Sequence, residues 1–542
     1  MIRISLFLIL LVALFSKLSA QQVITQGEFE KNDGLILKWN YNPALDSTVA
    51  RITSIVSADK LVWMLYDPAN TVSLTSVQQQ LTAAGANLAN VTFLQGTAES
   101  PWVCDYGPIV GYYVEDVTYN RHIADPQYFP SQFPLADNIP FLLSSDLYFH
   151  YEAMPLNLEG GNILIDGTSR GFVGDRVLKQ NPAMNSSQII QMLYSKLGLN
   201  NIVILPSLTV CGGGEWGELG RLMKFVDPET VLVAQYPSSS PNYQLLENLA
   251  STLSQTVNDM GKNFQVVRLP ISPNSDGGYA ADSSGEIRSY TSSIFLDNKI
   301  LIPSYGTASD AIALNTYKQV MPGWQFFQIP AQILTSMHGS LSRLATVMPQ
   351  QRQLRIRHSK IEGPHQYEGQ IWINAYIQSM ETIDSVQILW HKQSVPGFQL
   401  AQMLTCCGGS SGFLEDYTDT DTLSYYIKVY SGTFTQTLPL AAPGGTYTFW
   451  FDPFAATKPS VQNQAFTVYP NPATDFVRIK SNAAQTQTAS YSIVSPNGIV
   501  VAQGQLVDGQ AIKLPTPIAK GIYLITVNSK GKSVTSKLCV KP

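Results

Sequence analysis

The sequence predicts an α/β domain followed by two all-β regions. Up to about residue 348, short apolar runs such as Leu61–Tyr66 and Thr230–Ala234 alternate with helical patterns such as Leu74–Ala86. Strands that alternate with helices of roughly 10–15 residues are typical of α/β domains. After Pro349 the helical patterns stop, and segments with an alternation of period two, such as Ile371–Ile377, follow one another between turn residues. Regular short strands without helices indicate a β-sandwich.

The other predicted elements continue these two patterns. In the α/β part, strands are expected at Asn201–Leu205 and Ile300–Pro303, and helices at Ser187–Leu197 and Asn242–Met260. In the sandwich, strands are expected at Val386–Trp390, Leu423–Tyr430 and Tyr447–Phe451. We therefore predict an α/β domain at residues 21–349, a β-sandwich at 350–460, a linker over Pro453–Asn463 and a small all-β domain at 464–542.

Composition places the chain among folded proteins without a basic surface. The 542 residues include 34 Lys and Arg against 39 Asp and Glu, which gives a net charge of −5. Hydrophobic residues make up 44% and charged residues only 13%, so core material is ample and wholesale disorder is excluded. A mildly acidic chain without a long basic block gives no reason to expect a nucleic-acid partner.

The N-terminus indicates export. Arg3 precedes the apolar run Ile4–Phe15, and the small residue Ala20 follows shortly afterwards. This pattern predicts a secretory signal peptide at residues 1–20, and no later apolar run is long enough to predict a membrane-spanning segment. The cysteines lack the spacing of a metal site, and no metal or cofactor is expected.

The last segment resembles a known export signal. It contains Val468–Ala473 (VYPNPA), then Gly521–Tyr523 (GIY), then Lys537–Lys541 (KLCVK) at the end of the chain. These three elements, in this order, resemble the C-terminal sorting domain of type IX secretion. The resemblance implies the type IX machinery as a partner and a secreted or outer-surface location.

Two loops carry the candidate chemistry. Trp102–Pro108 (WVCDYGP) places Asp105 before a Gly-Pro turn, and Glu159–Asn162 (EGGN) leads into the strand-like Ile163–Asp166. Either loop alone is consistent with a simple turn, although paired glycines also permit a close approach of the backbone. Together, and with Val177–Pro182 further along the chain, the loops resemble the agmatine deiminases and bacterial peptidylarginine deiminases of the guanidine-modifying superfamily.

This resemblance implies a fold and a reaction. The fold is the pentein, an α/β propeller of ββαβ-type repeats, and the bacterial peptidylarginine deiminases carry an immunoglobulin-like sandwich after it. In the family, carboxylates hold a guanidinium cation, a Cys thiolate attacks its carbon, and a His moves the proton. The resemblance places Asp105 as the first of these carboxylates.

The other catalytic positions of the family are altered in this chain. Glu218 stands where the family has His, Gly220 where it has the second carboxylate, Ser292 where it has Asn, and Arg343 where it has the nucleophilic Cys. An arginine stays protonated and cannot act as a nucleophile. We expect Arg343 to pair with Asp105 or Glu218 and to fill the site; the alternative is a surface strand residue.

Six further residues carry alternatives. Glu159 is either a substrate contact or a structural partner of the loop backbone. Arg121 resembles a residue of the peptidylarginine deiminases that binds the C-terminal carboxylate of the substrate. A lone arginine is also typical of a structural salt bridge. Cys104 and Cys211 are either a disulfide or ordinary thiols, and Cys406 and Cys407 are likewise either buried thiols or a vicinal disulfide.

Three functions follow from these observations. The first is a secreted deiminase-like protein that has lost catalysis and binds an arginine-containing peptide, a small guanidine compound or a surface partner. The second is an active protein-arginine or agmatine deiminase with a rearranged site, which would convert a guanidinium to a ureido group and release ammonia. The third is a structural surface protein.

Overall fold

The computed structural model describes residues 22–115, 118–128, 133–206, 218–280, 286–406, 409–452, 466–471, 473–481, 489–494, 500–506, 510–515, 518, 521–529 and 532–540. The predicted signal peptide and the predicted linker lie outside these residues. The chain divides into two compact units, one of Met1–Gly363 with Glu368–Trp450 and one of Pro364–Tyr367 with Phe451–Pro542. The domain boundaries expected from the sequence remain predictions.

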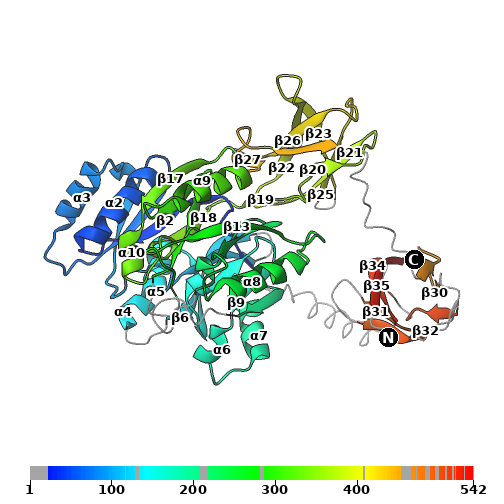
Figure 1. The fold of residues 1–542 in the computed structure, drawn as a ribbon, viewed down its shortest axis with the longest axis horizontal. Coiled ribbons are helices and arrows are strands. Elements are labelled where there is room, and N and C mark those ends of the chain that lie inside the picture. The colour runs from blue at the N-terminus through cyan, green and yellow to red at the C-terminus, as the bar shows by residue number, and fades with distance from the viewer. Residues whose placement is uncertain are drawn as a thin grey trace, which may run out of the picture. The chain divides into compact units, whose positions relative to one another are not determined.

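The first 349 residues form five small sheets with one repeated pattern (Figure 1). In each sheet, one strand pairs antiparallel with the next, which then pairs parallel with a third strand after a helical crossover. We call each such unit a module. The five sheets are separate from one another, and in the described part of the chain no sheet closes on itself.

The modules are built from the following strands. The first contains β18 (Thr346–Pro349), β2 (Asn32–Lys38), β3 (Leu61–Tyr66) and β4 (Val91–Gln95). The second contains β1 (Gln22–Thr25), β5 (Ile109–Glu115), β6 (Thr118–Gln127) and β7 (His150–Asn157). The third contains β8 (Ile163–Ile165), β9 (Arg170–Gly174) and β10 (Asn201–Leu205). The fourth contains β11 (Met223–Asp227), β12 (Thr230–Gln235), β13 (Gln265–Ser272) and β14 (Arg288–Ser289). The fifth contains β15 (Ile294–Leu296), β16 (Lys299–Ser304) and β17 (Gln325–Pro330).

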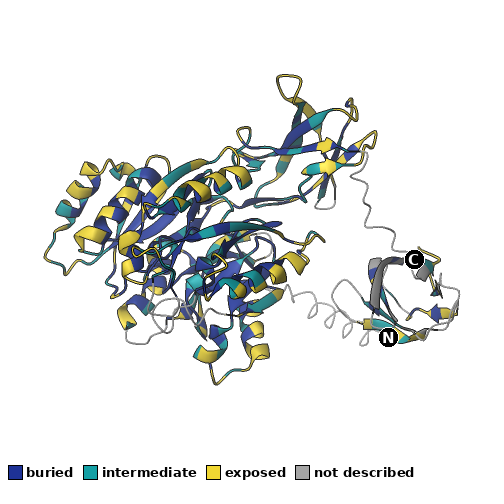
Figure 2. Cartoon of the chain, in the orientation of Figure 1, coloured by how far each residue is buried: buried dark blue, intermediate teal, exposed yellow. Residues whose placement is uncertain are grey.

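The helices fill the crossovers and bury one face each (Figure 2). They are α2 (Pro43–Val56), α3 (Leu74–Ala83), α4 (Pro134–Asp137), α5 (Ile139–Leu147), α6 (Arg176–Gln180), α7 (Ser186–Leu197), α8 (Tyr243–Gln255), α9 (Ser309–Val320) and α10 (Gln332–Ser336). Local sequence sets their ends: Asn185 forms a capping box with Gln188 at the start of α7, and Gly198 ends α7 with φ +66°. The helix ends there because a glycine adopts this left-handed conformation without strain.

The last strand of this region completes the first module. β18 pairs antiparallel with β2, with Thr346 opposite Ile36 and Val347 opposite Leu35. Behind this sheet, Leu35 and Leu37 pack in one apolar cluster with Val49 of α2. The two ends of the α/β region are therefore joined in one sheet.

The all-β part that follows contains two facing sheets. One sheet has the order β19 (Leu354–Arg357), β21 (Ile371–Ser379), β25 (Gly409–Leu414) and β24 (Leu404–Cys406). The other contains β28 (Tyr447–Phe451), β26 (Thr422–Ser431), β22 (Ile383–Lys392) and β23 (Gln399–Gln402), with β27 (Phe434–Leu438) also beside β26. Strand β20 (Gly363–His365) falls at the border between the compact units. A side chain at Gly412 in β25 would meet Ile388 of β22 at 2.9 Å, so the two sheets pack face to face.

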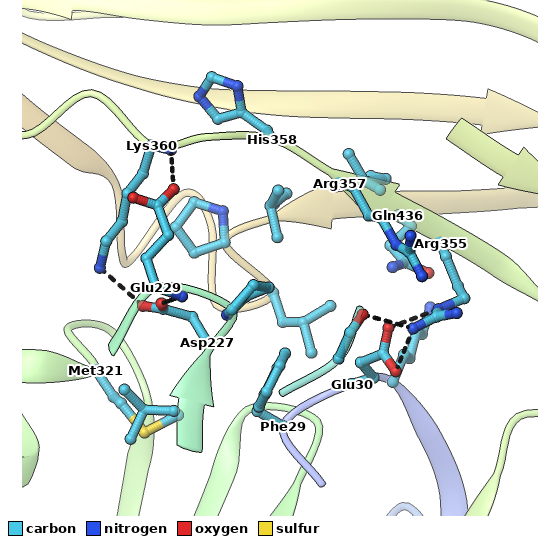
Figure 3. A pocket seen from close by; sticks show the side chains of 18 of the residues that line it. Phe29, Glu30, Asp227, Glu229, Met321, Arg355, Arg357, His358, Lys360 and Gln436 are labelled. Atoms are coloured by element: carbon cyan, nitrogen blue, oxygen red, sulfur yellow. Dashed lines mark hydrogen bonds and ion pairs between the residues drawn. The ribbon is translucent and has the colours of Figure 1, made fainter. Parts of the chain in front are cut away.

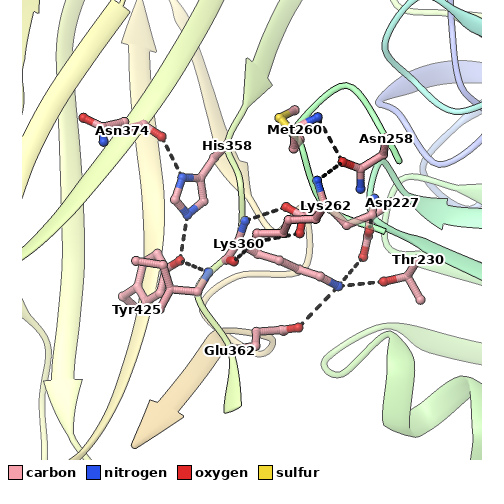
Figure 4. Close-up of polar contacts among 12 residues, drawn as sticks. Asp227, Thr230, Asn258, Met260, Lys262, His358, Lys360, Glu362, Asn374 and Tyr425 are labelled. Carbon is pink, nitrogen blue, oxygen red and sulfur yellow. Dashed lines mark hydrogen bonds and ion pairs between the residues drawn. The ribbon is translucent and has the colours of Figure 1, made fainter. Parts of the chain in front are cut away.

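Ionic and polar contacts attach this all-β part to the α/β part (Figure 4). Lys360 Nζ lies 2.8 Å from Asp227 Oδ2, and the Lys360 amide donates to Glu229 Oε1 at 2.8 Å. Although burial opposes its charge, Asp227 and Glu362 raise the pKa of Lys360. Lys262 lies 2.9 Å from the other Glu229 oxygen. The attachment is therefore a network of partly desolvated charges.

The second compact unit has an apolar core of its own. Its sheets are β29 (Phe466–Tyr469), β30 (Phe476–Ser481) and β33 (Ala511–Lys513), and β32 (Val500–Leu506), β31 (Ala489–Val494), β34 (Gly521–Ser529) and β35 (Lys532–Val540). Val477, Ile493, Ile525 and Leu538 are among its buried residues. In the described residues of the whole chain, we find no helix that is both long and apolar enough to cross a membrane.

The sequence-based elements agree with this fold. The strands expected at Leu61–Tyr66, Asn201–Leu205 and Tyr447–Phe451 are confirmed with the same bounds. The helix expected at Asn242–Met260 is shorter, because α8 ends at Gln255 and Val257 forms a bridge with Asn263.

We predict that His358 makes stability depend on pH. Its ring is enclosed between the Asn374 carbonyl and the Tyr425 hydroxyl, each at 2.7 Å, and burial lowers its pKa to about 4. An unfolded histidine has a pKa of about 6.5, so stability is lost as the pH falls from about 6.5 towards 4. Between pH 7 and pH 4.5 this single group should cost about 2–3 kcal/mol of unfolding free energy.

The measurement is denaturant unfolding of the wild type and of His358→Gln at both pH values. The variant is expected to lose stability at pH 7 but to show a smaller further loss at pH 4.5. An equal loss on acidification in both proteins would contradict the assignment, as would a His358 resonance titrating near pH 6.5 by NMR.

Candidate active site

The candidate residues occupy equivalent loops of the five modules. Asp105 lies shortly before β5, Glu159 before β8, Glu218 before β11, Ser292 before β15 and Arg343 before β18. In each module this is the strand that pairs antiparallel with the first strand of the parallel pair. Residues far apart in the sequence are therefore brought to comparable positions by the repeated fold.

Arg343 is held by both candidate carboxylates. Its Nε lies 2.9 and 3.0 Å from the two Asp105 oxygens, and its Nη2 also bonds Asp105. The same Nε lies 2.6 Å from Glu218 Oε1. Arg343 is 4% exposed and Asp105 is fully buried. The expected pairing of Arg343 is confirmed, and the alternative of a surface strand residue is wrong.

Further contacts fix the orientation of the Arg343 guanidinium. Its carbon lies 5.0 Å from the centre of the Trp102 ring, within the range of a cation–π contact, and Nη1 donates to the His338 carbonyl at 2.9 Å. Gly339 permits this stacking, because a side-chain carbon there would lie 1.9 Å from the Trp102 ring. The guanidinium plane is thus held by two carboxylates, a carbonyl and an aromatic ring.

Two other arginines neutralise the remaining acidic groups. Arg221 is 1% exposed, and its Nε lies 3.4 Å from Glu218 Oε2. Arg176 Nη2 lies 3.2 Å from Glu159 Oε1, which also accepts from Gln180 at 2.8 Å. These partners of Glu159 are side chains of α6 and not loop backbone, and both alternatives for Glu159 stay predictions.

The cluster balances its own charge. Asp105, Glu159 and Glu218 face Arg176, Arg221 and Arg343, so three acidic groups meet three basic ones among the described residues.

Burial sets the protonation of this cluster. Burial raises the pKa of Asp105 to about 7, against the effect of Arg343, and nearby Glu218 and Glu159 raise it further. Although burial opposes its charge, Asp105 and Glu218 raise the pKa of Arg343. An additional guanidinium would therefore enter a buried site in which each of the three carboxylates already has an arginine partner.

Gly220 and Ser292 lie beside this cluster. The Gly220 carbonyl accepts a hydrogen bond from Thr291 Oγ1 at 3.1 Å, and the Ser292 carbonyl accepts from the Ser342 amide at 3.1 Å. A side-chain carbon at Gly220 would meet only the Gly161 carbonyl, at 3.5 Å. The position therefore has room for a Cβ atom.

Arg121 and Cys104 have different surroundings. Arg121 lies 3.8 Å from Asp33 and 4.3 Å from the Phe149 ring centre, and in the described residues it makes no contact with the Asp105 cluster. Its role in binding stays a prediction. Cys104 carries a free thiol, so the alternative of a Cys104–Cys211 disulfide is wrong; Cys211 itself lies outside the described residues, as does Cys407.

The Cys104 thiol is poorly placed for catalysis. Burial raises its pKa well above the usual value, and the neighbouring carboxylates of Asp105, Glu28 and Glu218 raise it further. A protonated thiol is not a nucleophile. Across the described part of the chain, no group of three or more His, Cys, Asp and Glu side chains is placed to hold a metal ion.

Two family models match the chain, one over the α/β part and one over the last segment. The model of the Porphyromonas-type peptidyl-arginine deiminase matches residues 24–349. The chain belongs to this family. The model of the secretion system C-terminal sorting domain matches residues 467–541, and this tail directs a deiminase-family protein to export by type IX secretion and to the outer surface.

Individual related proteins share less than a third of their residues with this chain over the matched region. A putative agmatine deiminase of Legionella pneumophila is 27% identical over 214 residues, which are 38% of this chain and 59% of that protein. A putative agmatine deiminase of Yersinia pestis is 23% identical over 287 residues, covering 48% of this chain and 78% of the relative.

Solved structures share the fold. The putative arginine deiminase of Porphyromonas gingivalis has 18% identity and a TM-score of 0.53, covering 61% of this chain and 99% of its own. The agmatine deiminase of Enterococcus faecalis has 16% identity and a TM-score of 0.52, covering 61% and 96%. The α/β part of this deiminase-family protein therefore has the pentein-like deiminase fold.

Sequence reasoning missed the neutralising arginines of the site. Arg176 and Arg221 were not singled out, although each lies beside a segment that was recognised. Arg221 lies three residues after Glu218 and three before Lys224, so it stands in an ordinary charged segment whose pattern does not signal burial.

We predict that Arg343→Ala destabilises the protein by about 3–5 kcal/mol, because it leaves the buried Asp105 and Glu218 without their shared cation. The matched control is Arg352→Ala, which removes an arginine that is 51% exposed and pairs with Glu381 at 2.9 Å. An exposed pair of this kind contributes about 0–1 kcal/mol. Denaturant unfolding of the two variants checks the difference, and similar losses in both would contradict the buried-pair assignment.

Proposed function

We propose that this exported member of the deiminase family has lost hydrolysis of guanidinium groups and acts as a binding protein. The observation that carries the loss of hydrolysis is the placement of the Arg343 guanidinium on Asp105 and Glu218, stacked on Trp102. These are the contacts that a guanidinium ligand would need. Arg343 therefore acts as a permanent internal occupant of the guanidinium subsite.

The chemistry of the remaining residues supports the loss of catalysis. Deimination requires a thiolate near the guanidinium carbon and a group that delivers a proton to the leaving ammonia. Arg343 stands at the nucleophile position of the family and stays protonated. The nearby Cys104 thiol is kept neutral by burial. No described side chain combines the required reactivity with a place beside Asp105.

The occupied subsite also disfavours binding of guanidine compounds there. An arginine-containing peptide or agmatine would have to displace Arg343 from two buried carboxylates. Breaking such a pair without replacing it costs several kcal/mol. A guanidine ligand would therefore bind weakly unless Arg343 leaves the site.

The second candidate is an active deiminase with a rearranged site. The retained Asp105 and the Glu159–Asn162 segment favour it, because they are the parts of the family pattern that persist. A structural surface protein is the third candidate. For the fold, we propose that the five modules form the propeller of the pentein and that the sandwich is immunoglobulin-like, and we propose that residues 1–20 act as a signal peptide.

We predict that the protein releases no citrulline from an arginine-ended peptide and forms no ureido product from agmatine. The reason is the absence of a nucleophile at the guanidinium subsite. Both products are measured in parallel with the Asp105→Asn variant, which keeps the shape of the side chain. A rate above that of Asp105→Asn would contradict the proposal and favour the active deiminase.

We also predict that methylguanidinium restores an Arg343→Ala variant. At 1–20 mM, a range chosen to lie about two orders of magnitude below denaturing concentrations, it should refill the vacated subsite and raise the melting temperature of the variant. The wild type should not respond, because its subsite is already occupied. Methylammonium is the matched control, since it has the charge without the planar fork.

An equal response of wild type and variant, or an equal effect of both cations, would contradict internal occupation by Arg343. If Arg343→Ala fails to fold, Arg343→Lys is used instead. That variant keeps a charge and loses the bidentate geometry, so a smaller rise with methylguanidinium is expected.

A further inference from the structure

A second site lies where the α/β part meets the first all-β part (Figure 3). A cavity of about 110 Å³ opens there, within the first compact unit. Its lining comes from the segment before β2, from residues 226–229, from residues 320–324, from β19 and from β27. None of these residues belongs to the Asp105 cluster, so the cavity is independent of the deiminase site.

One part of the cavity wall is apolar. Phe29, Met321, Trp324, Leu438 and Tyr447 contribute to the lining. An apolar cavity of about 150 Å³ in a protein core can hold a benzene molecule. The space here is about a quarter smaller, so it matches an apolar body of roughly four or five carbon atoms.

The polar part of the wall carries buried groups without partners. Gln353 is 2% exposed, and neither its amide nitrogen nor its amide oxygen has a hydrogen-bond partner. The same holds for Gln436 Oε1, Arg355 Nη1 and Arg357 Nε. Buried polar groups are nearly always hydrogen-bonded in native proteins. Their convergence on one cavity indicates a polar ligand.

The charges of the lining are unevenly neutralised. Arg355 is paired with Glu30 at 2.6 and 2.9 Å, which leaves its Nη1 unused. Arg357 donates to the Thr168 carbonyl at 3.0 Å, and no carboxylate among the described residues lies within ion-pair distance of it. Burial lowers the pKa of Arg357, and neighbouring Arg355 lowers it further. Arg357 is thus a largely desolvated cation that still lacks an anion.

The carboxylates of Asp227 and Glu229, which line the cavity, already have lysine partners. Figure 3 shows Arg355, Arg357 and Gln436 together on one side and Asp227, Glu229 and Lys360 on the other. Asp227 pairs with Lys360, and Glu229 pairs with Lys262 and accepts from the Lys360 amide. On the side of the two arginines, Glu30 is the acidic partner of Arg355, so one positive charge remains in surplus there. Lys31 also lines the cavity.

We propose that this cavity binds a small organic carboxylate with an apolar body. The carboxylate accepts hydrogen bonds from Arg357 Nε and Arg355 Nη1, which both carry unused N–H groups. The Gln353 amide bonds a further polar atom, and the body packs against Phe29 and Met321. Two guanidinium groups repel a cation, and the volume excludes a large polyanion. The proposal holds whether or not the Asp105 site is catalytic.

The test is calorimetric titration of the full-length protein with 4-methylpentanoate. The matched ligand is 4-methylpentanamide, which has the same body without the charge. We expect the acid to bind at least tenfold more tightly than the amide. L-Leucine forms a second arm with the same body and an added ammonium group. Tighter binding of leucine identifies an amino acid as the source of the carboxylate, and tighter binding of 4-methylpentanoate identifies a simple organic acid.

Arg357→Gln is expected to weaken binding of the preferred acid at least tenfold, and Arg357→Lys less. Arg352→Gln is the matched control and should bind as the wild type does, because Arg352 is exposed and outside the cavity. Circular dichroism and melting temperature establish that each variant is folded. Equal affinity for acid and amide overturns the proposal. So does the absence of saturable binding of either acid to the wild type, or unchanged binding in folded Arg357→Gln.

Discussion

The ion pair of Arg343 with Asp105 and Glu218 is the interaction on which the deiminase-family site depends. Arg343, Asp105 and Glu218 come from three different modules, so their contacts connect three loops. The Cys104 amide also donates to the Arg343 carbonyl at 3.0 Å. Full burial makes the pair costly to break, because each separated charge would face a desolvated environment. Asp105, to which we assign guanidinium binding from the resemblance to deiminases, is here part of the internal structure through its pairing with Arg343.

Ancestry, destination and activity are encoded in different parts of this chain. The repeated modules and the matched family model establish descent from deiminases, and the sorting tail establishes export. Activity depends instead on a few side chains in the loops of the modules, where we propose that Arg343 and Gly220 depart from the family pattern. A fold tolerates such changes, because its strands and helices do not use these side chains. Under our proposal, a catalytic scaffold persists here without its reaction.

Much of this could be anticipated from the sequence, for identifiable reasons. Strand β3 was predicted with its correct bounds, because a buried parallel strand is a continuous apolar run between polar turns. The pairing of Arg343 was anticipated because a buried charge requires a partner. Arg176 and Arg221 were not, since nothing local distinguishes a buried arginine from a solvated one. The cavity proposed to bind a carboxylate could not be predicted from the sequence, because Phe29, Met321 and Arg355 come together only in the folded chain.

The pairing of β18 with β2 also has a consequence for how the protein is made. The strand that completes the first module is the last of the deiminase region, more than 300 residues downstream. Until residue 349 has left the ribosome or the translocation channel, β2 keeps one unpaired edge, and such an edge invites pairing with other chains. Contacts of such long sequence separation also form slowly. An exported chain of this design gains from staying unfolded, or guarded by a chaperone, until its synthesis has passed this strand.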